Sequence, residues 1–401
     1  MKSVLIFFRN VKADFEEGYI SGVLRAFKSG GFAVDTVEIL SHTDDLGFRR
    51  RLEEFKDTVD NLIIVGGDRV DFNIKNLIAK IFDSALVENE NARTFLDVVS
   101  KEKNIAYPDE YALLPIDGTV IPNIHGGFQG FILDTNDLTL SLLPYEYQEI
   151  KSMCDKYVLP YLENKLGIRK TRLTLKYFGE VSALEKTLLK AEKMAKTKLV
   201  WTVNETFGDI TLDLLFDYDT IEQDKKDIVR FIVSNHASEI YAEYDVSLSQ
   251  RLFDLLKLRG LTLSTAESFT GGRIISEIIK NSGASAFVNE GVVSYSNQSK
   301  IKRLGVIQQD LTRSGAVSSI VAYQMAVGLL KEGCDVAIST TGIAGPKSDN
   351  TDKPVGLCYI AVGMKDGVHT YRYKFDGTRE QITETAKNTA LFLAIKKLKS
   401  L

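Results

Sequence analysis

The stretch Thr265-Ala-Glu-Ser-Phe-Thr-Gly-Gly272 carries the strongest single indication of the fold. Residues 261–265 read as a strand that runs into it, and residues 273–281 after it have helical spacing. Two glycines at such a turn let the backbone approach a ligand, and the N–H groups of a first helical turn favour an anion or a developing oxyanion. Ser268 and Thr270 stand where a nucleophile or a phosphate contact would lie, although on spacing alone either is more simply a helix N-cap.

A second turn of this kind is Tyr295-Ser-Asn-Gln-Ser-Lys300, which follows the apolar run 291–294. No histidine is close in sequence, so a serine nucleophile would need another base. A lysine kept neutral by burial can do that work, and Lys300 is the candidate. The alternative is a surface lysine on a helix over residues 298–304.

A third turn, Ala337-Ile-Ser-Thr-Thr-Gly-Ile-Ala-Gly-Pro346, ends another apolar run. Its Thr340 and Thr341 would occupy the ligand crevice at the carboxyl end of an α/β sheet. Further on, Thr378 is a candidate cap of the last helix, and Arg379 could hold a phosphate. Three turns rich in Gly, Ser and Thr within about 80 residues lead us to expect one shared pocket.

Upstream, strand-like and helix-like runs alternate, which predicts a parallel sheet with helices on both faces. The assigned strands are residues 3–8, 33–40 and 61–65, and the assigned helices are residues 17–28 and 49–58. From about residue 170 the pattern changes to a βαββα unit, with strands at 171–178, 198–203 and 210–216 and helices at 182–195 and 221–234. After residue 245 a third unit opens with a helix over 252–258.

Composition excludes several classes of protein. The 401 residues suggest two or three cores, and 50 Lys plus Arg against 54 Asp plus Glu give a net charge of −4, too even for a dedicated nucleic-acid binder. No run of about 18 apolar residues is present, so we expect no membrane span and a cytoplasmic protein. Cys154, Cys334 and Cys358 lack metal-type spacing, which favours neither a disulfide framework nor a His/Cys metal site.

The net charge is divided unevenly along the chain. Residues 246–401 hold 20 basic and 13 acidic residues, a net of +7, whereas the remainder has a net of −11. The C-terminal part is therefore basic, which suits a phosphate-bearing substrate.

Six ordered motifs between residues 252 and 398 closely resemble the C-terminal domain of the CinA family, the competence/damage-inducible proteins. They are TAESFTGG, GVVSYSNQSKIKRLGV, SGAVS at 314–318, TTGIAGP, KPVG at 353–356 and DGTRE. Characterised family members include nicotinamide mononucleotide (NMN) deamidases, so the resemblance implies hydrolysis of the NMN carboxamide to nicotinic acid mononucleotide and ammonia.

Carried onto matching positions, the resemblance implies a serine nucleophile and a lysine base, without metal or other cofactor. The implied catalytic residues are Ser268, Lys300 and Thr341, and the implied substrate-binding residues are Thr270, Gly271, Gly272, Tyr295, Asn297, Gly342 and Arg379. Members of this length are generally dimers, which implies a homodimer. Phe269 departs from the family, which usually has Cys there, and we expect altered packing rather than lost chemistry.

The N-terminal part is similar to molybdopterin-binding proteins, a three-layer α/β fold that in some family members hydrolyses ADP-ribose with a divalent metal. The segments at 113–123, 143–153 and 159–162 match, but the functional loops, here Phe8-Arg-Asn-Val-Lys-Ala-Asp14 and Gly66-Gly-Asp-Arg-Val-Asp-Phe-Asn73, do not. Asp68 and Asp71 could coordinate a metal only weakly. We therefore expect this domain not to be catalytic, and a divalent metal is implied only if it is.

The βαββα unit is similar to the KH-like linking domain of long CinA proteins but lacks a GXXG loop, so no nucleic-acid binding is inferred. The expected division is a degenerate molybdopterin-binding-like domain at 1–167, the KH-like domain at 168–245 and an α/β deamidase domain at 246–401. Two alternatives stay open. One is a non-catalytic nucleotide-binding regulatory or scaffold protein, and the other is a residual ADP-ribose pyrophosphatase in the first domain.

Overall fold

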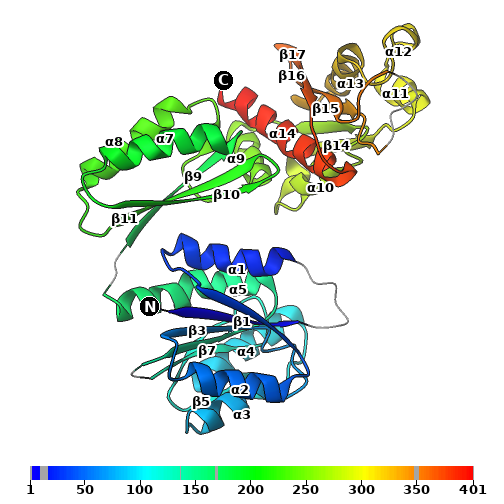
Figure 1. The fold of residues 1–401 in the computed structure, drawn as a ribbon. Helices are drawn as coiled ribbons and strands as arrows, with labels where there is room; N and C mark the ends of the chain where they lie inside the picture. The colour runs from blue at the N-terminus through cyan, green and yellow to red at the C-terminus, as the bar shows by residue number, and fades with distance from the viewer. Residues whose placement is uncertain (1, 10–16, 136, 168–169, 347–351, 401) are drawn as a thin grey trace. The chain divides into compact units, whose positions relative to one another are not determined.

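The computed structural model describes residues 2–9, 17–135, 137–167, 170–346 and 352–400, and its helices and strands interleave along the chain (Figure 1). The expected α/β class is therefore confirmed. Internal packing divides the chain into two units. The first comprises Met1–Arg172, Thr197–Thr202 and Leu215–Thr220, and the second comprises Leu173–Lys196, Val203–Leu214 and Ile221–Leu401. The division into three domains stays a prediction, and its first boundary falls at residues 168–169, outside the described ranges.

Six strands form the sheet of the first unit, in the order β2-β1-β3-β8-β7-β6. Their bounds are β1 (Ser3–Arg9), β2 (Thr36–Ser41), β3 (Asn61–Val65), β6 (Gly118–Ile121), β7 (Gly130–Asp134) and β8 (Thr139–Leu143). The first four are parallel, as expected, but β7 runs antiparallel to its two neighbours, β8 and β6. Its connections to them are too short for a crossover, which is why it returns antiparallel. The expected loop at residues 8–14 lies mostly outside the described residues.

Helices cover both faces of this sheet. They are α1 (Glu17–Ser29), α2 (Asp45–Phe55), α3 (Ile74–Ile81), α4 (Glu90–Lys103), α5 (Tyr147–Met153), the π-helical turn η2 (Cys154–Val158) and α6 (Leu159–Lys165). The short strands β4 (Leu86–Glu88) and β5 (Leu113–Pro115), which α4 and the turn η1 (Asp109–Ala112) separate in the chain, form a small antiparallel sheet of their own. Alternate residues of β1 enter opposite cores: Phe8 packs with Phe48 of α2, whereas Phe7 packs with Phe27 of α1. Burial on both faces explains the unbroken apolar run of this strand.

Two helices begin four residues earlier than their apolar spacing predicted. Helix α2 starts at Asp45 because the Asp44 side chain accepts a hydrogen bond from the Gly47 N–H at 2.9 Å. Helix α9 (Leu248–Arg259) starts after Ser247, which accepts from the Gln250 N–H at 3.1 Å. Each side chain satisfies an N–H group that the helix leaves unpaired, so the cap rather than the first apolar residue sets the start.

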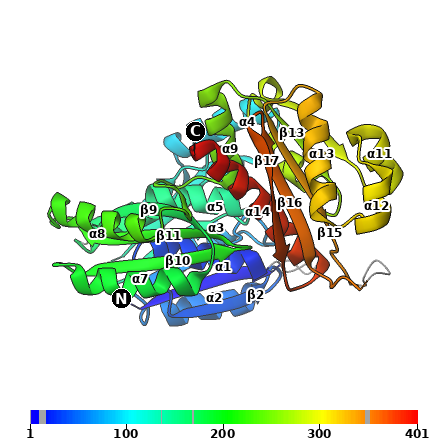
Figure 2. The ribbon, with the colours of Figure 1, turned by 90° about the horizontal axis from the view of Figure 1, so that it is seen from above.

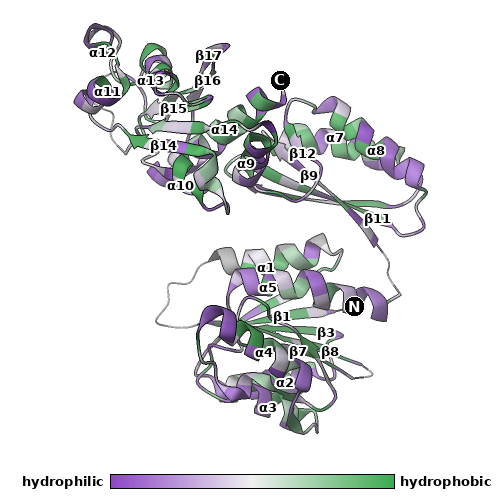
Figure 3. Cartoon of the chain, turned by 180° about the vertical axis from the view of Figure 1, so that it is seen from behind, coloured by the Kyte–Doolittle hydropathy of each residue, from purple (hydrophilic) through white to green (hydrophobic). Residues whose placement is uncertain are grey.

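The middle segment has the expected βαββα order. It comprises β9 (Lys170–Phe178), α7 (Val181–Met194), β10 (Leu199–Thr206), β11 (Asp209–Asp217) and α8 (Glu222–Asn235), and the short β12 (Ile240–Ala242) pairs antiparallel with β9. Figure 3 shows many hydrophilic residues along α7 and α8, while Leu184 and Leu188 of α7 are buried. This amphipathic pattern fits helices that cover one face of a sheet.

The sheet of the C-terminal segment has the order β14-β13-β15-β16-β17. Its strands are β13 (Leu263–Glu267), β14 (Val288–Val293), β15 (Val336–Gly342), β16 (Leu357–Met364) and β17 (Gly367–Lys374). The helices around it are α9, α10 (Arg273–Ile279), α11 (Asn297–Leu304), α12 (Gln308–Ser314), α13 (Ser319–Lys331) and α14 (Arg379–Lys399), with the turn η3 (Ala284–Ala286) (Figure 2). Helices α9 and α14 share one core and α13 lies in another.

The register of the three parallel strands brings their ends together. Glu267, the last residue of β13, lies opposite Val293 of β14 and opposite Thr340 of β15. The chain therefore leaves each strand at the same edge of the sheet, which is the edge where α/β proteins place ligands. β13 runs two residues beyond the expected end at Thr265, so Ser268 comes directly after the strand.

Helix α14 also joins this sheet to the middle segment. Asn388 Nδ2 donates hydrogen bonds to the carbonyls of Thr206 and Phe207, and Phe392 stacks on Phe178 with ring centroids 4.7 Å apart. These contacts lie within the second unit. No helix in the described ranges combines the length and apolar character that a membrane span requires.

A close approach of two helices yields a stability prediction. A Cβ on Gly328 of α13 would lie 2.3 Å from the carbonyl oxygen of Leu304, the last residue of α11. In an open helix Gly→Ala stabilises by about 0.5–1 kcal/mol, but here backbone must move. We expect Gly328→Ala to lower the free energy of unfolding by about 1–3 kcal/mol in chemical denaturation. Tyr323→Ala, on an exposed site of α13, serves as the control, and a stabilised Gly328→Ala protein would contradict the packing described.

Candidate active site

The three turns that follow the parallel strands line one pocket of about 240 Å³. It collects residues from the turn after β13, from α11, from the end of β15 and from the start of α14. Its lining residues are Ser268, Phe269, Tyr295, Lys300, Ala316, Val317, Thr341, Gly342, Ile343, Ala344, Gly345 and Arg379. The pocket therefore unites six of the ten predicted site residues: Ser268, Tyr295, Lys300, Thr341, Gly342 and Arg379.

Lys300 reaches the pocket from the first turn of α11, and its side chain is 1% exposed. Helix α11 begins here because the Ser296 hydroxyl caps it, accepting from the Ser299 N–H at 3.1 Å. Burial lowers the pKa of Lys300 to about 8, which brings the neutral amine within reach of physiological pH. Lys300 is therefore not a surface lysine.

Three oxygens surround the Lys300 amine. Nζ lies 3.0 Å from Ser268 Oγ, 2.7 Å from the Ser294 carbonyl oxygen and 3.2 Å from the Tyr295 carbonyl oxygen. A neutral amine has two N–H groups and one lone pair. If the two carbonyls accept both N–H groups, the lone pair is left for the hydroxyl proton of Ser268, which is the geometry that a general base requires.

Ser268 lies in a tight turn and is 8% exposed. Its N–H donates to the Thr340 carbonyl at 3.0 Å, and its own carbonyl accepts from the Gly271 N–H at 3.3 Å. Gly271 and Gly272 have φ of +62° and +92°, where a side chain would strain the backbone. Neither Ser268 nor Thr270 caps α10, because the cap residue is Gly272 and no cap side chain bonds there.

The start of α10 is not open to a ligand as the sequence suggested. The Glu267 carboxylate accepts hydrogen bonds from the N–H groups of Gly272, Ile274 and Ile275 at 3.0, 3.2 and 2.9 Å. These donors are already satisfied, so the expectation that they bind an anion is corrected. The sequence feature that could have indicated this is Glu267 itself, an acidic residue just before a helix start, where negative charge is favoured.

Four of the predicted binding residues lie outside the lining. Thr270 is fully buried, and its hydroxyl forms a hydrogen bond of 2.7 Å with Thr340 Oγ1. Gly271 and Gly272 form the turn, and Asn297 is exposed as the first residue of α11. The Thr270 hydroxyl is bonded within the protein, and a role for Thr270 in substrate binding stays a prediction.

Three side chains near the pocket donate hydrogen bonds to backbone carbonyls of neighbouring loops. Thr341 Oγ1 donates to Ala316 O at 2.8 Å, and Arg379 Nη1 donates to Gly345 O at 2.7 Å. Lys353, which sequence reasoning did not single out, donates from Nζ to the carbonyls of Ser314 and Val317 at 2.7 and 2.6 Å. The KPVG motif was the signal that could have identified it.

Phe269 occupies the position where the family usually has Cys. Its ring is 5% exposed and packs in a small core with Ala344, Cys358 and Ile382. A Cβ on Gly342 would lie 2.9 Å from this ring and 2.6 Å from Cys358 Cβ, so glycine is required beside it. The aromatic ring of Phe269 thus forms part of the pocket wall.

Asp68 and Asp71, the weak candidate metal ligands that the sequence suggested, lie in the first unit. Within the described ranges no three His, Cys, Asp or Glu side chains gather as a metal site would need. Asp68 lies 3.5 Å from Arg69 Nε, whereas Asp71 pairs with His42 at 3.4 Å, so the two carboxylates have different partners. Burial raises the pKa of Asp68 to about 6, which further weakens it as a cation ligand.

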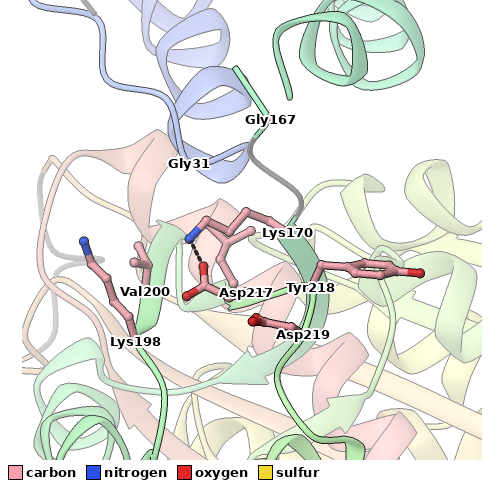
Figure 4. Close-up of a pocket in the computed structure, with 9 residues that line it drawn as sticks. Gly31, Gly167, Lys170, Lys198, Val200, Asp217, Tyr218 and Asp219 are labelled. Atoms are coloured by element: carbon pink, nitrogen blue, oxygen red, sulfur yellow. Dashed lines mark hydrogen bonds and ion pairs between the residues drawn. The ribbon is translucent and has the colours of Figure 1, made fainter. Parts of the chain in front are cut away.

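A larger hollow of about 630 Å³ lies in the first unit, where Lys170 and Asp217 form an ion pair at 2.6 Å (Figure 4). Its lining comprises Gly31, Gly167, Lys170, Lys198, Val200, Leu215, Asp217, Tyr218 and Asp219. This set holds no serine or cysteine nucleophile. The smaller pocket around Ser268 is therefore the candidate active site.

Comparison with known proteins identifies the family to which the chain is similar. The model of the family described as the CinA C-terminal domain matches residues 245–398. A CinA-like protein of Geotalea uraniireducens is 34% identical over 85% of this chain and 84% of its own length, and one of Chlorobium limicola is 31% identical over 90% and 89%. The crystal structure of the competence/damage inducible protein CihA of Agrobacterium tumefaciens is 39% identical over 38% of this chain and 93% of its own, with a TM-score of 0.37. The chain belongs to the CinA family.

Proposed function

We propose that the chain is an amidohydrolase that converts nicotinamide mononucleotide to nicotinic acid mononucleotide and ammonia in the Ser268 pocket. The observation that carries the proposal is the buried contact of 3.0 Å between Lys300 Nζ and Ser268 Oγ. A site that only binds a nucleotide needs no hydroxyl beside a lysine whose pKa is lowered. This pairing therefore favours turnover over a regulatory or scaffold role.

The proposed reaction has two steps, and Lys300 carries the proton in both. Ser268 Oγ attacks the carboxamide carbon while its proton passes to Lys300 Nζ, which then gives a proton to the departing nitrogen as ammonia leaves. A water molecule, deprotonated by the neutral Lys300, attacks the resulting ester and releases the carboxylate and the Ser268 hydroxyl. No metal or other cofactor is part of the proposal.

Substrate binding is assigned to the rest of the pocket. Arg379 uses Nη1 on the Gly345 carbonyl, and its remaining N–H groups have no partner among the described residues, which suits a phosphate. Tyr295 is 69% exposed at the same pocket and offers an aromatic face for a pyridine ring or ribose. We propose no catalytic role for the N-terminal domain. The homodimer and the cytoplasmic location stay predictions.

Removing either member of the pair should abolish turnover. We expect Ser268→Ala and Lys300→Met to lower ammonia release from NMN at least about 10³-fold, since nucleophile and base act as one unit. Lys300→Met keeps an unbranched side chain in the buried site, and Lys302→Met on the exposed side of α11 is its matched control. Undiminished release by Ser268→Ala would rule out the mechanism.

The acid side of the pH profile should report Lys300. Its pKa of about 8 means that the amine is protonated, and inactive as a base, below that pH. We expect kcat/KM to rise about tenfold per pH unit up to about pH 8 and then to level, as measured by ammonia release between about pH 5 and pH 10. A profile that is flat down to about pH 5 would require another base.

Arg379 should matter for the phosphate. We expect Arg379→Gln to raise KM for NMN about 10- to 100-fold, which corresponds to the loss of one charge-assisted contact. The same variant should change the much weaker turnover of nicotinamide riboside, which lacks the phosphate, by no more than about threefold. Equal losses on both substrates would show that Arg379 acts only through the Gly345 loop.

A further inference from the structure

Glu267 is a buried acidic residue that the chemistry proposed above does not use. It is 0% exposed, and no lysine or arginine of the described residues forms an ion pair with it. A buried carboxylate is costly unless other groups compensate it. Here three backbone N–H groups do so, from Gly272, Ile274 and Ile275.

The hydrogen bond from the Gly272 N–H to the Glu267 carboxylate closes a ring that contains residues 267–272 and therefore the nucleophile. Residues 268–271 are thus held at both ends of the turn. Thr265 Oγ1 lies 3.4 Å from Oε1 and holds the same carboxylate toward β13. Ser268 lies inside this ring, with its own N–H bound to Thr340 O.

The backbone carbonyl of Glu267 is linked to Lys300, the proposed base, by two successive hydrogen bonds. The Glu267 carbonyl accepts from the Ser294 N–H at 2.8 Å, and the Ser294 carbonyl in turn accepts from Lys300 Nζ at 2.7 Å. The side chain of Glu267 thus holds the turn that carries Ser268, and its backbone carbonyl is hydrogen-bonded to Ser294, which in turn binds Lys300.

We propose that Glu267 is the positioning residue that keeps Ser268 Oγ and Lys300 Nζ in reacting geometry. This inference rests on the proposed serine–lysine chemistry and adds a residue to it. Glu267 does not touch the substrate and transfers no proton. Its function is to fix the turn, because misplacement of a nucleophile by about 1 Å costs about 10²-fold in rate.

The test measures how fast Ser268 reacts, without relying on NMN. Full-length protein is mixed with a fluorophosphonate, and mass spectrometry follows the phosphonyl ester that forms on Ser268 as fluoride leaves. We expect Glu267→Gln, which turns one acceptor into an N–H₂ group facing N–H groups, to slow labelling about 10- to 100-fold. Glu267→Asp keeps the charge but shortens its reach, and it should fall between Gln and wild type.

Glu384→Gln is the matched control. Glu384 also contacts α10, through Arg273 Nε at 3.0 Å, but it lies outside the ring around Ser268. We expect this variant to label within about twofold of wild type. Glu267→Gln labelling at the wild-type rate would overturn the proposal; if that variant does not fold, as judged by thermal unfolding, Glu267→Asp decides in the same way.

The pH dependence separates positioning from an electrostatic effect on the base. If Glu267 only positions, the labelling rate of the variant falls by one factor at every pH and the acid limb does not move. A displaced limb would mean that Glu267 acts on the charge of Lys300, which contradicts the proposal. Wild type that labels at Ser268 yet releases no ammonia from NMN would refute the proposed substrate and leave the positioning test intact.

Discussion

The structure of the candidate site depends on one buried amine. Lys300 Nζ lies among two backbone carbonyls and the Ser268 hydroxyl, with its side chain 1% exposed. Burial lowers the pKa of the amine to about 8, and the two carbonyls are placed to accept both N–H groups of the neutral amine, which would leave its lone pair for the serine. An amine in water would be protonated, whereas an amine in an apolar core without acceptors would have no fixed orientation. The fold therefore has to supply both burial and acceptors.

The C-terminal sheet supplies them through the register of three parallel strands. Glu267 opposes Val293 on one side and Thr340 on the other, so Ser268, Ser294 and Thr341 follow at the same level. Helix α11 then places the Lys300 amine within hydrogen-bonding distance of Ser268. Helix α13 packs so closely on α11 that a glycine is needed at position 328. The packing of the core and the geometry of the candidate site thus depend on the same elements.

The sequence allowed much of this to be predicted. The α/β class followed from alternating apolar runs, and the shared pocket followed from three polar turns at strand ends, because parallel strands deliver their carboxyl ends to one edge. Glu267 and Lys353 were missed because their roles depend on which backbone groups meet after folding, and spacing along the chain does not reveal that. The antiparallel direction of β7 and the early starts of α2 and α9 were likewise decided by short connections and caps rather than by periodicity.

The proposed function depends on the acylation of Ser268 by the substrate, with Lys300 as the base. The most direct measurement is to mix the protein with NMN, quench it in acid within milliseconds, and determine by mass spectrometry which peptide carries the nicotinic acid mononucleotide acyl group. We expect an ester on Ser268 that forms before ammonia release reaches steady state and is absent in Lys300→Met. Steady ammonia release by wild type with no ester on Ser268, or an adduct on another residue, would contradict it.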